Sequence, residues 1–149
     1  MKRILSRILI LLLLIMALTA CGSEETTGLQ DGYYTAQAAD FNFGWKEYIT
    51  IMVKGGDIVS VEYNAENPSG FIKSWDNAYM QTMLHSNGTY PNEYTRYYAS
   101  QLLEGQGEVP IDAISGAGSS WGSFQKLSAA VLEQARQGDS SIAVVNTAE

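Results

Sequence analysis

Residues 49–63 read ITIMVKGGDIVSVEY, and this stretch decides the fold. Apolar side chains recur at alternate positions on both sides of a central turn, which is the pattern of half-buried strands. The turn, residues 55–57, contains two glycines and an aspartate, which tolerate the positive φ of tight hairpin turns. The alternating apolar residues are Ile49, Ile51 and Val53 before the turn and Val59, Val61 and Tyr63 after it. The sequence therefore predicts a β-hairpin with one apolar face.

The segments around the hairpin predict one more strand and three helices. Residues 32–38 are expected to form the first strand, and residues 74–84 a short helix. A second helix is expected to begin at Pro91, since proline is common at the first helical position, and a third is closed by Gly138. The side chains at helical spacing are Ala78, Tyr79 and Met83 in the first helix, Tyr94, Tyr97, Tyr98, Gln101 and Leu102 in the second, and Trp121, Phe124, Leu127, Val131 and Ala135 in the third.

These elements predict an α+β domain, a small antiparallel sheet with helices packed on it. The domain is expected over residues 31–138, with a C-terminal tail at residues 139–149. A chain of about 120 residues beyond the N-terminal segment is the size of one ordinary domain.

The first 21 residues have the pattern of a bacterial lipoprotein signal. Three cations and no acid precede an unbroken apolar run over residues 8–18, which is typical of a secretory signal. The run is shorter than the roughly 20 apolar residues that span a bilayer core, which disfavours the alternative of an uncleaved signal anchor. Residues 18–21, LTAC, resemble a lipobox, and this resemblance implies that residues 1–20 are removed and that Cys21, the sole cysteine, carries a lipid. Residues 21–30 would then be a flexible tether on the extracytoplasmic face of the cell membrane.

The charge of the exported chain restricts its partners. Removing residues 1–20 takes away three cations and no acids, so the formal charge of −7 becomes −10, with six basic against sixteen acidic side chains. Nucleic acid is disfavoured as a partner because little basic surface is available to displace phosphate counterions. Docking on anionic lipid is disfavoured as well, so the lipid anchor should hold the protein at the membrane.

Residues 112–122, DAISGAGSSWG, are the segment best suited to bind a ligand. Small residues and hydroxyls lead directly into the last predicted helix, where free N–H groups and the positive end of the helix dipole favour an anion such as phosphate. Small side chains also let a ligand approach the backbone. The alternative is ordinary capping, in which Ser119 or Ser120 satisfies the first turn of the helix.

Residues 112–117, DAISGA, resemble the start of the Asp-x-x-Ser/Thr-Gly-Ala-Thr signature of FMN-binding domains. Such domains occur in flavinylated subunits of sodium-pumping quinone reductases and in small bacterial surface lipoproteins, some labelled major membrane immunogens. Residues 31–36, the hairpin, the Tyr-rich middle and the closing helix are similar to those lipoproteins over most of residues 31–136. The resemblance implies an FMN-binding-domain-like fold, FMN as cofactor and redox partner proteins. It also implies flavin-linked electron transfer by a carrier or binding protein rather than by a stand-alone enzyme.

The chain departs from this signature at Gly118. In the family, a flavin transferase joins the FMN phosphate to the hydroxyl of the threonine that ends the signature, and glycine has no oxygen for that bond. Three readings stay open: FMN is bound without a covalent bond, it is attached at Ser119 or Ser120, or it has been lost while the fold is kept. The rival function is a non-redox surface lipoprotein that binds a partner or another small ligand. The candidate FMN-binding residues are Asp112, Ser115, Gly116, Ala117, Gly118, Ser119 and Ser120.

Aromatic side chains are the other candidates for a ligand site. Trp75, Trp121 or a tyrosine could stack on a flavin ring, although Trp121 fits core packing better because it lies on the helix stripe. The loop at residues 40–45, DFNFGW, is expected to pack as a lid over the sheet, and contact with a ligand or partner is the alternative. No metal site is predicted, since a lipidated Cys21 leaves His85 without a cysteine partner.

Overall fold

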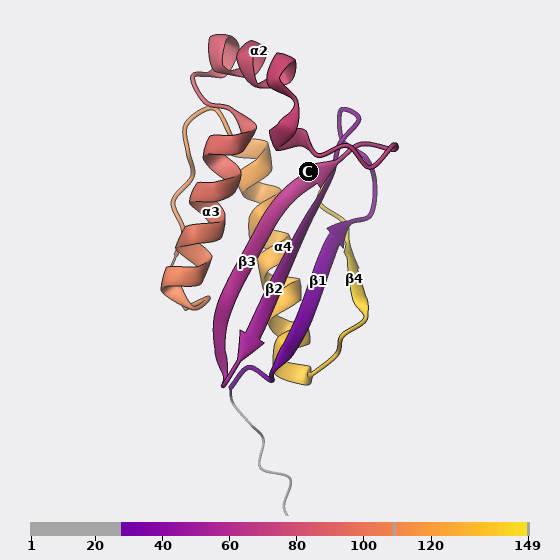
Figure 1. Ribbon diagram of the computed structural model, residues 1–149, viewed down its shortest axis with the longest axis vertical. Coiled ribbons are helices and arrows are strands. Elements are labelled where there is room, and N and C mark those ends of the chain that lie inside the picture. The colour runs from indigo at the N-terminus through magenta and orange to yellow at the C-terminus, as the bar shows by residue number, and fades with distance from the viewer. Residues whose placement is uncertain (1–27, 109, 149) are drawn as a thin grey trace, which may run out of the picture.

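The computed structural model describes residues 28–108 and 110–148, which form a four-stranded sheet with helices on one face (Figure 1). The strands are β1 (Gly32–Ala38), β2 (Lys46–Lys54), β3 (Asp57–Glu66) and β4 (Ile142–Val145), in the order β3-β2-β1-β4. β1 and β3 pair antiparallel with β2, whereas β4 pairs parallel with β1. The predicted α+β class is confirmed, but the sheet is mixed because residues 139–149, expected as a tail, supply the parallel strand β4.

The predicted hairpin forms, with one correction to its second strand. Val53 pairs with Ile58 and Met52 pairs with Ser60, so Val59 is an extra residue in a β-bulge. The bulge turns Ile58 into the core, where it is 2% exposed, and leaves Val59 45% exposed. The prediction that Val59 shares the apolar face of Val61 and Tyr63 is therefore wrong, because alternation alone does not reveal an inserted residue.

Two helices cover the inner face of the sheet, as predicted. α3 (Pro91–Gly105) packs against β3, and α4 (Gly118–Gln137) packs against β1 and β2. Pro91 is the first residue of α3, and Gly138 ends α4 in the left-handed conformation with φ +68°. The ring centre of Phe124 on α4 lies 5.0 Å from that of Tyr63 on β3 and 5.2 Å from that of Tyr98 on α3. These three elements therefore meet in one aromatic cluster. The largest buried side chains are Tyr63, Tyr94, Tyr98, Phe124, Ile49, Ile51, Leu102, Leu127, Val53 and Val131.

The helix predicted at residues 74–84 begins later than expected. Residues Lys73–Trp75 form a single 3₁₀ turn, η1, and α2 runs over Asn77–Asn87. The carboxylate of Asp76 accepts the backbone N–H of Tyr79 at 3.0 Å, and this cap sets the start of α2. No residue of α2 is buried, and the helix projects beyond the end of the sheet (Figure 1). Of the three side chains expected to face inward, Ala78 is exposed and Tyr79 and Met83 are half-buried.

The first described residues contact the last turn of α4. The backbone N–H of Gln30 donates to the carbonyl of Ala135 at 2.8 Å, and its side chain donates to the carbonyl of Arg136 at 3.0 Å. The last residues of the predicted tether are thus held by the domain, while the signal segment, the lipobox and Cys21 lie outside the described residues. Among the helices of residues 28–108 and 110–148, none is long and apolar enough to cross a membrane.

Candidate ligand cavity at the start of α4

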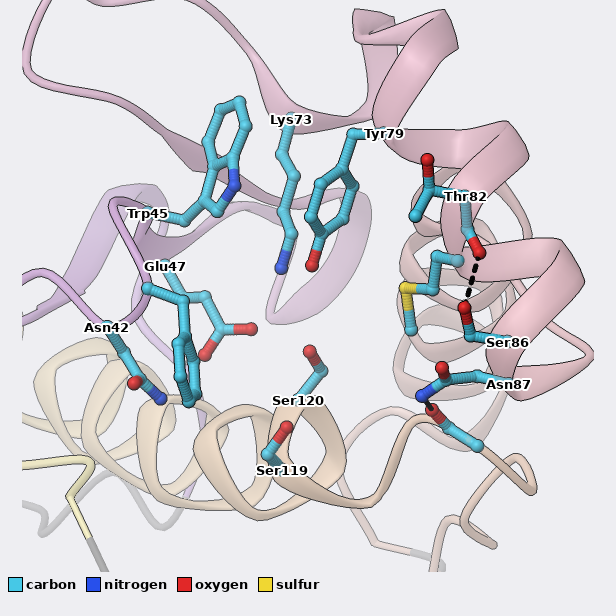
Figure 2. A pocket seen from close by; sticks show the side chains of 13 residues that line it. Asn42, Trp45, Glu47, Lys73, Tyr79, Thr82, Ser86, Asn87, Ser119 and Ser120 are labelled. Carbon is cyan, nitrogen blue, oxygen red and sulfur yellow. Dashed lines mark hydrogen bonds between the residues drawn. The ribbon is translucent and has the colours of Figure 1, made fainter.

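A cavity of about 280 Å³ opens at the N-terminal end of α4, between that helix, the loop before β2, η1 and α2 (Figure 2). Its walls come from segments that are far apart in the sequence, since the β1–β2 loop, β2, η1, α2 and α4 all contribute. Its lining residues are Asn42, Phe43, Trp45, Glu47, Lys73, Tyr79, Thr82, Met83, Ser86, Asn87, Gly116, Ser119 and Ser120.

The loop that resembles the FMN-binding signature reaches this cavity through Gly116. Gly116 has φ +86°, and an added Cβ would collide with the backbone carbonyl oxygen of Asn87 at the end of α2. The side-chain amide of Asn87 in turn donates to the carbonyl of Gly116 at 3.3 Å. Glycine is therefore required here both by the backbone conformation and by the close approach of α2.

The first turn of α4 has no side-chain cap. Ala117 occupies the cap position and makes no side-chain hydrogen bond, and the first helical bond runs from the N–H of Trp121 to the carbonyl of Ala117 at 2.9 Å. The amides of Gly118, Ser119 and Ser120 have no hydrogen-bond acceptor within the described part of the chain. The capping alternative for Ser119 or Ser120 is wrong, because both serines lie inside the first turn instead of preceding it.

Lys73 is a buried cation that points into the cavity. Its side chain is 8% exposed, and Figure 2 shows the ammonium group directed toward the space between Glu47, Tyr79 and Ser120. Among the described residues it has no hydrogen bond and no carboxylate within 4.0 Å, although its nitrogen lies 5.2 Å from the ring centre of Tyr79. Burial lowers the pKa of the Lys73 ammonium, and the charge of Glu47 partly offsets this effect.

Glu47 is joined to the start of α4 through a buried phenol. The hydroxyl of Tyr63 lies 2.9 Å from a carboxylate oxygen of Glu47 and 2.8 Å from the carbonyl oxygen of Ser120, and its single proton can be donated to either. Burial and the neighbouring Glu47 charge raise the pKa of Tyr63 well above its usual value. The phenol therefore stays protonated, and its hydrogen bond to Ser120 connects β3 to the first turn of α4.

Aromatic side chains form the remaining wall. The rings of Trp45 and Tyr79 meet edge to face at 5.9 Å, and Trp45 is 8% exposed. Phe43 is 93% exposed and also borders a second cavity, of about 300 Å³, which shares Asn42 and Ser119 with the first. Asn42, Phe43 and Trp45 of the loop at residues 40–45 thus line the cavity, and contact of this loop with a ligand or partner stays a prediction.

The structure brings together only part of the predicted site. Gly116, Ser119 and Ser120 line the cavity, and Ala117 is buried beside them. Asp112 and Ser115 are exposed and lie outside the lining. At Gly118 an added Cβ would meet nothing within 4 Å, so the backbone there accepts a side chain.

The aromatic candidates chosen from the sequence lie elsewhere. Trp75 is 67% exposed and lies outside the lining of this cavity. Trp121 is half-buried beside the core and donates its indole N–H to the carbonyl of Ile111 at 2.9 Å, which agrees with the packing role expected for it. The rings that do line the cavity are those of Phe43, Trp45 and Tyr79.

Sequence reasoning missed Glu47 and Lys73. A signal for Glu47 exists, because it continues the core-facing row of Ile49, Ile51 and Val53 along β2, where a carboxylate is unexpected. Lys73 gives a weaker signal, as a single cation in an apolar stretch that forms only one 3₁₀ turn.

The fold is similar to those of two solved structures. The fold is an α+β domain with a cavity at a helix start, and it matches the crystal structure of a Clostridium perfringens protein with a TM-score of 0.75, at 34% identity, over 79% of this chain and 98% of that one. A Clostridium thermocellum protein solved by NMR matches with a TM-score of 0.50, at 31% identity, over 72% of this chain and 92% of that one. No protein-family profile matches the chain.

The sequence is 34% identical over 119 residues to the 15 kDa lipoprotein of Treponema pallidum (strain Nichols), over 79% of this chain and 84% of the relative. The chain belongs to the family of that lipoprotein, and it is a membrane-associated lipoprotein.

Proposed function

We propose that this lipoprotein binds FMN in the cavity at the start of α4 and transfers electrons on the extracytoplasmic side of the membrane. The observation that carries the proposal is the convergence of the signature loop, an uncapped helix start and an aromatic wall on one cavity. Free amides at a helix N-terminus suit the FMN phosphate, and aromatic side chains suit the flavin ring.

The residues present fit this group. A cavity of about 280 Å³ is slightly smaller than the roughly 300–1,000 Å³ usual for small-molecule sites, so it can enclose part of FMN. The second cavity, across Phe43, offers room for the remainder because Asn42, Phe43 and Ser119 border both. When bound, FMN supplies one- and two-electron chemistry, and the protein holds and orients it.

The position of the cavity relative to the lipid anchor supports partners on the extracytoplasmic side. The chain enters the domain at the last turn of α4, where Gln30 binds the carbonyls of Ala135 and Arg136, whereas the cavity lies at the first turn. A helix of 20 residues spans about 30 Å. With a lipid on Cys21, the cavity would face away from the membrane, toward extracytoplasmic redox proteins.

Flavin content is the direct test of this function. The protein is exported with Cys21 replaced, in a host that supplies a flavin transferase, and its intact mass and visible absorption spectrum are measured. We expect a flavin spectrum, with unchanged mass if FMN is held without a covalent bond and with the mass of FMN added if Ser119 or Ser120 carries it. Colourless protein of unchanged mass that also ignores added FMN would contradict the proposal.

A second function, a non-redox lipoprotein that binds another ligand, is favoured by Gly118 alone, which stands where the FMN-binding signature has its attachment threonine. Gly118→Thr separates the two functions, since the site has room for a side chain. If the scaffold is that of an FMN-binding domain, the transferase should add one FMN to the Gly118→Thr protein, and peptide mapping should place it at residue 118. Gly118→Ala is the matched control, because it adds a Cβ without a hydroxyl. Absence of FMN from the wild type and from Gly118→Thr would favour the non-redox function.

A further inference from the structure

We propose that Lys73 and the free amides of residues 118–120 form a subsite for the phosphate group of a phosphate monoester. The proposal rests on the proposed function for the position of the ligand and deepens it, because it assigns the recognition of charge to a residue outside the signature.

The helix side of the subsite consists of three N–H groups that point out of the first turn of α4. They lack acceptors among the described residues, and neither serine is placed to cap them. Hydrogen bonds from such amides to an anion, added to the positive end of the helix dipole, are a common way to hold phosphate. A bare helix start is nevertheless found in many proteins, so it does not establish a site by itself.

The independent observation is Lys73, which is buried without an anion. A charged side chain at 8% exposure is normally paired, because its removal from water is costly. Here no carboxylate of the described chain lies within 4.0 Å of the nitrogen, and the ring centres of Tyr79 and Tyr94 lie 5.2 and 5.9 Å from it. Ring faces attract a cation but leave its three hydrogen-bond donors unused. An anion in the cavity would accept these donors.

Glu47 limits what this anion can be. Its carboxylate lines the same cavity and is held by Tyr63 without forming an ion pair with Lys73. An anion in the cavity is attracted by Lys73 and repelled by Glu47, so the subsite needs an anionic group that accepts hydrogen bonds from several donors at once. A phosphate monoester has three terminal oxygens, enough to meet the ammonium group and the amides together.

The test compares FMN with riboflavin, which differ by the phosphate. The full chain, expressed without a flavin transferase and purified in detergent, is titrated with each flavin by fluorescence, and inorganic phosphate is added as a competitor. We expect FMN to bind at least about 10-fold more tightly than riboflavin, in line with charge-assisted hydrogen bonds, and phosphate to displace it. Lys73→Met should remove most of this difference, because it should weaken FMN binding much more than riboflavin binding.

Three further variants separate recognition from structure. Lys126→Met removes the same charge from an exposed lysine outside the cavity and should leave both affinities unchanged. Glu47→Gln removes the repulsive charge and should tighten FMN binding, and its amide oxygen can still accept from Tyr63. Lys73→Arg keeps the charge and should retain most of the FMN preference. Lys73→Met should also raise the thermal midpoint of the ligand-free protein, because it removes an unpaired buried charge.

The outcomes distinguish this proposal from the proposed function. If FMN binds but Lys73→Met weakens both flavins equally or neither, the subsite is overturned and the FMN function stands. If neither flavin binds while inorganic phosphate binds in a Lys73-dependent way, the subsite stands and the FMN function is overturned. If no flavin and no phosphate binds, both are overturned.

Discussion

The two ends of α4 differ in how their backbone groups are satisfied. At the C-terminal end, the N–H of Gly138 donates to the carbonyl of Gln134, and Gln30 binds the carbonyls of Ala135 and Arg136. At the N-terminal end, three amides have no acceptor within the described chain, and a buried cation points into the cavity that Ser119 and Ser120 line. One helix thus has a closed end that secures the fold and an open end that faces a cavity.

The difference between the two ends shows where polar groups are free to bind a ligand. An unpaired buried lysine reduces stability, and the free amides at the start of α4 are hydrogen-bond donors that a ligand can use. A ligand that accepts hydrogen bonds from both Lys73 and the free amides would explain why they lie at the same cavity. Substitutions at the closed end should therefore change stability and leave ligand binding intact, while substitutions at the open end should change binding.

The largest effect is expected at Gly116, where the signature loop meets α2. Gly116→Ala forces a side chain into a left-handed conformation and against the carbonyl of Asn87. We expect a loss of about 2–4 kcal/mol in the free energy of unfolding, together with loss of ligand binding, measured by urea denaturation and flavin titration. Gly118→Ala is the control, since its Cβ meets nothing within 4 Å and its effect on stability should be small. Equal stability of both variants would show that α2 and the loop do not depend on this contact.

The next effect concerns the phenols beneath the open end. Burial raises the pKa of Tyr63 and of Tyr94, so the unfolded chain loses these protons first as the pH rises. The two protonated phenols therefore contribute fully to the free energy of unfolding below the unfolded pKa of about 10. Above that pH the contribution falls, and each phenol loses up to about 1.4 kcal/mol for every pH unit.

Tyr94→Phe isolates one of these phenols. The Tyr94 hydroxyl has no partner of good hydrogen-bond geometry among the described residues, so the variant should be about as stable as the wild type at neutral pH. Above pH 10 it should lose stability less steeply than the wild type in denaturation curves taken at a series of pH values. Parallel pH profiles would contradict the burial of this phenol.

The smallest effect is expected at the closed end. Gly138→Ala places a Cβ at φ +68° and against the side chain of Gln30, which can move aside. We expect a cost of about 1 kcal/mol, seen as a lower thermal midpoint, with flavin affinity unchanged. A change in flavin affinity would mean that the two ends of α4 are coupled.

The sequence predicts the parts of the fold that have a regular apolar period. The β2–β3 hairpin and the stripe from Phe124 to Ala135 follow from alternation and helical spacing, because burial selects apolar residues at those positions. The start of α2 and the strand β4 were missed for the opposite reason. α2 has no buried residue, and β4 is a short strand that adds to the edge of β1.

The candidate site was only half predictable from the chain. Gly116, Ser119 and Ser120 could be named from the sequence because small and hydroxyl residues lead directly into a predicted helix and resemble the FMN-binding signature. Lys73 and Glu47 belong to distant elements, and only the folded chain brings them to that helix.

The most direct test of the open-end account is an NMR titration of the ¹⁵N-labelled protein with FMN, following every backbone amide. The account predicts large shifts for the amides of residues 118–120, smaller ones around Lys73, and unchanged signals for residues 134–138. Shifts centred on the closed end of α4, or no shifts at any FMN concentration, would contradict it.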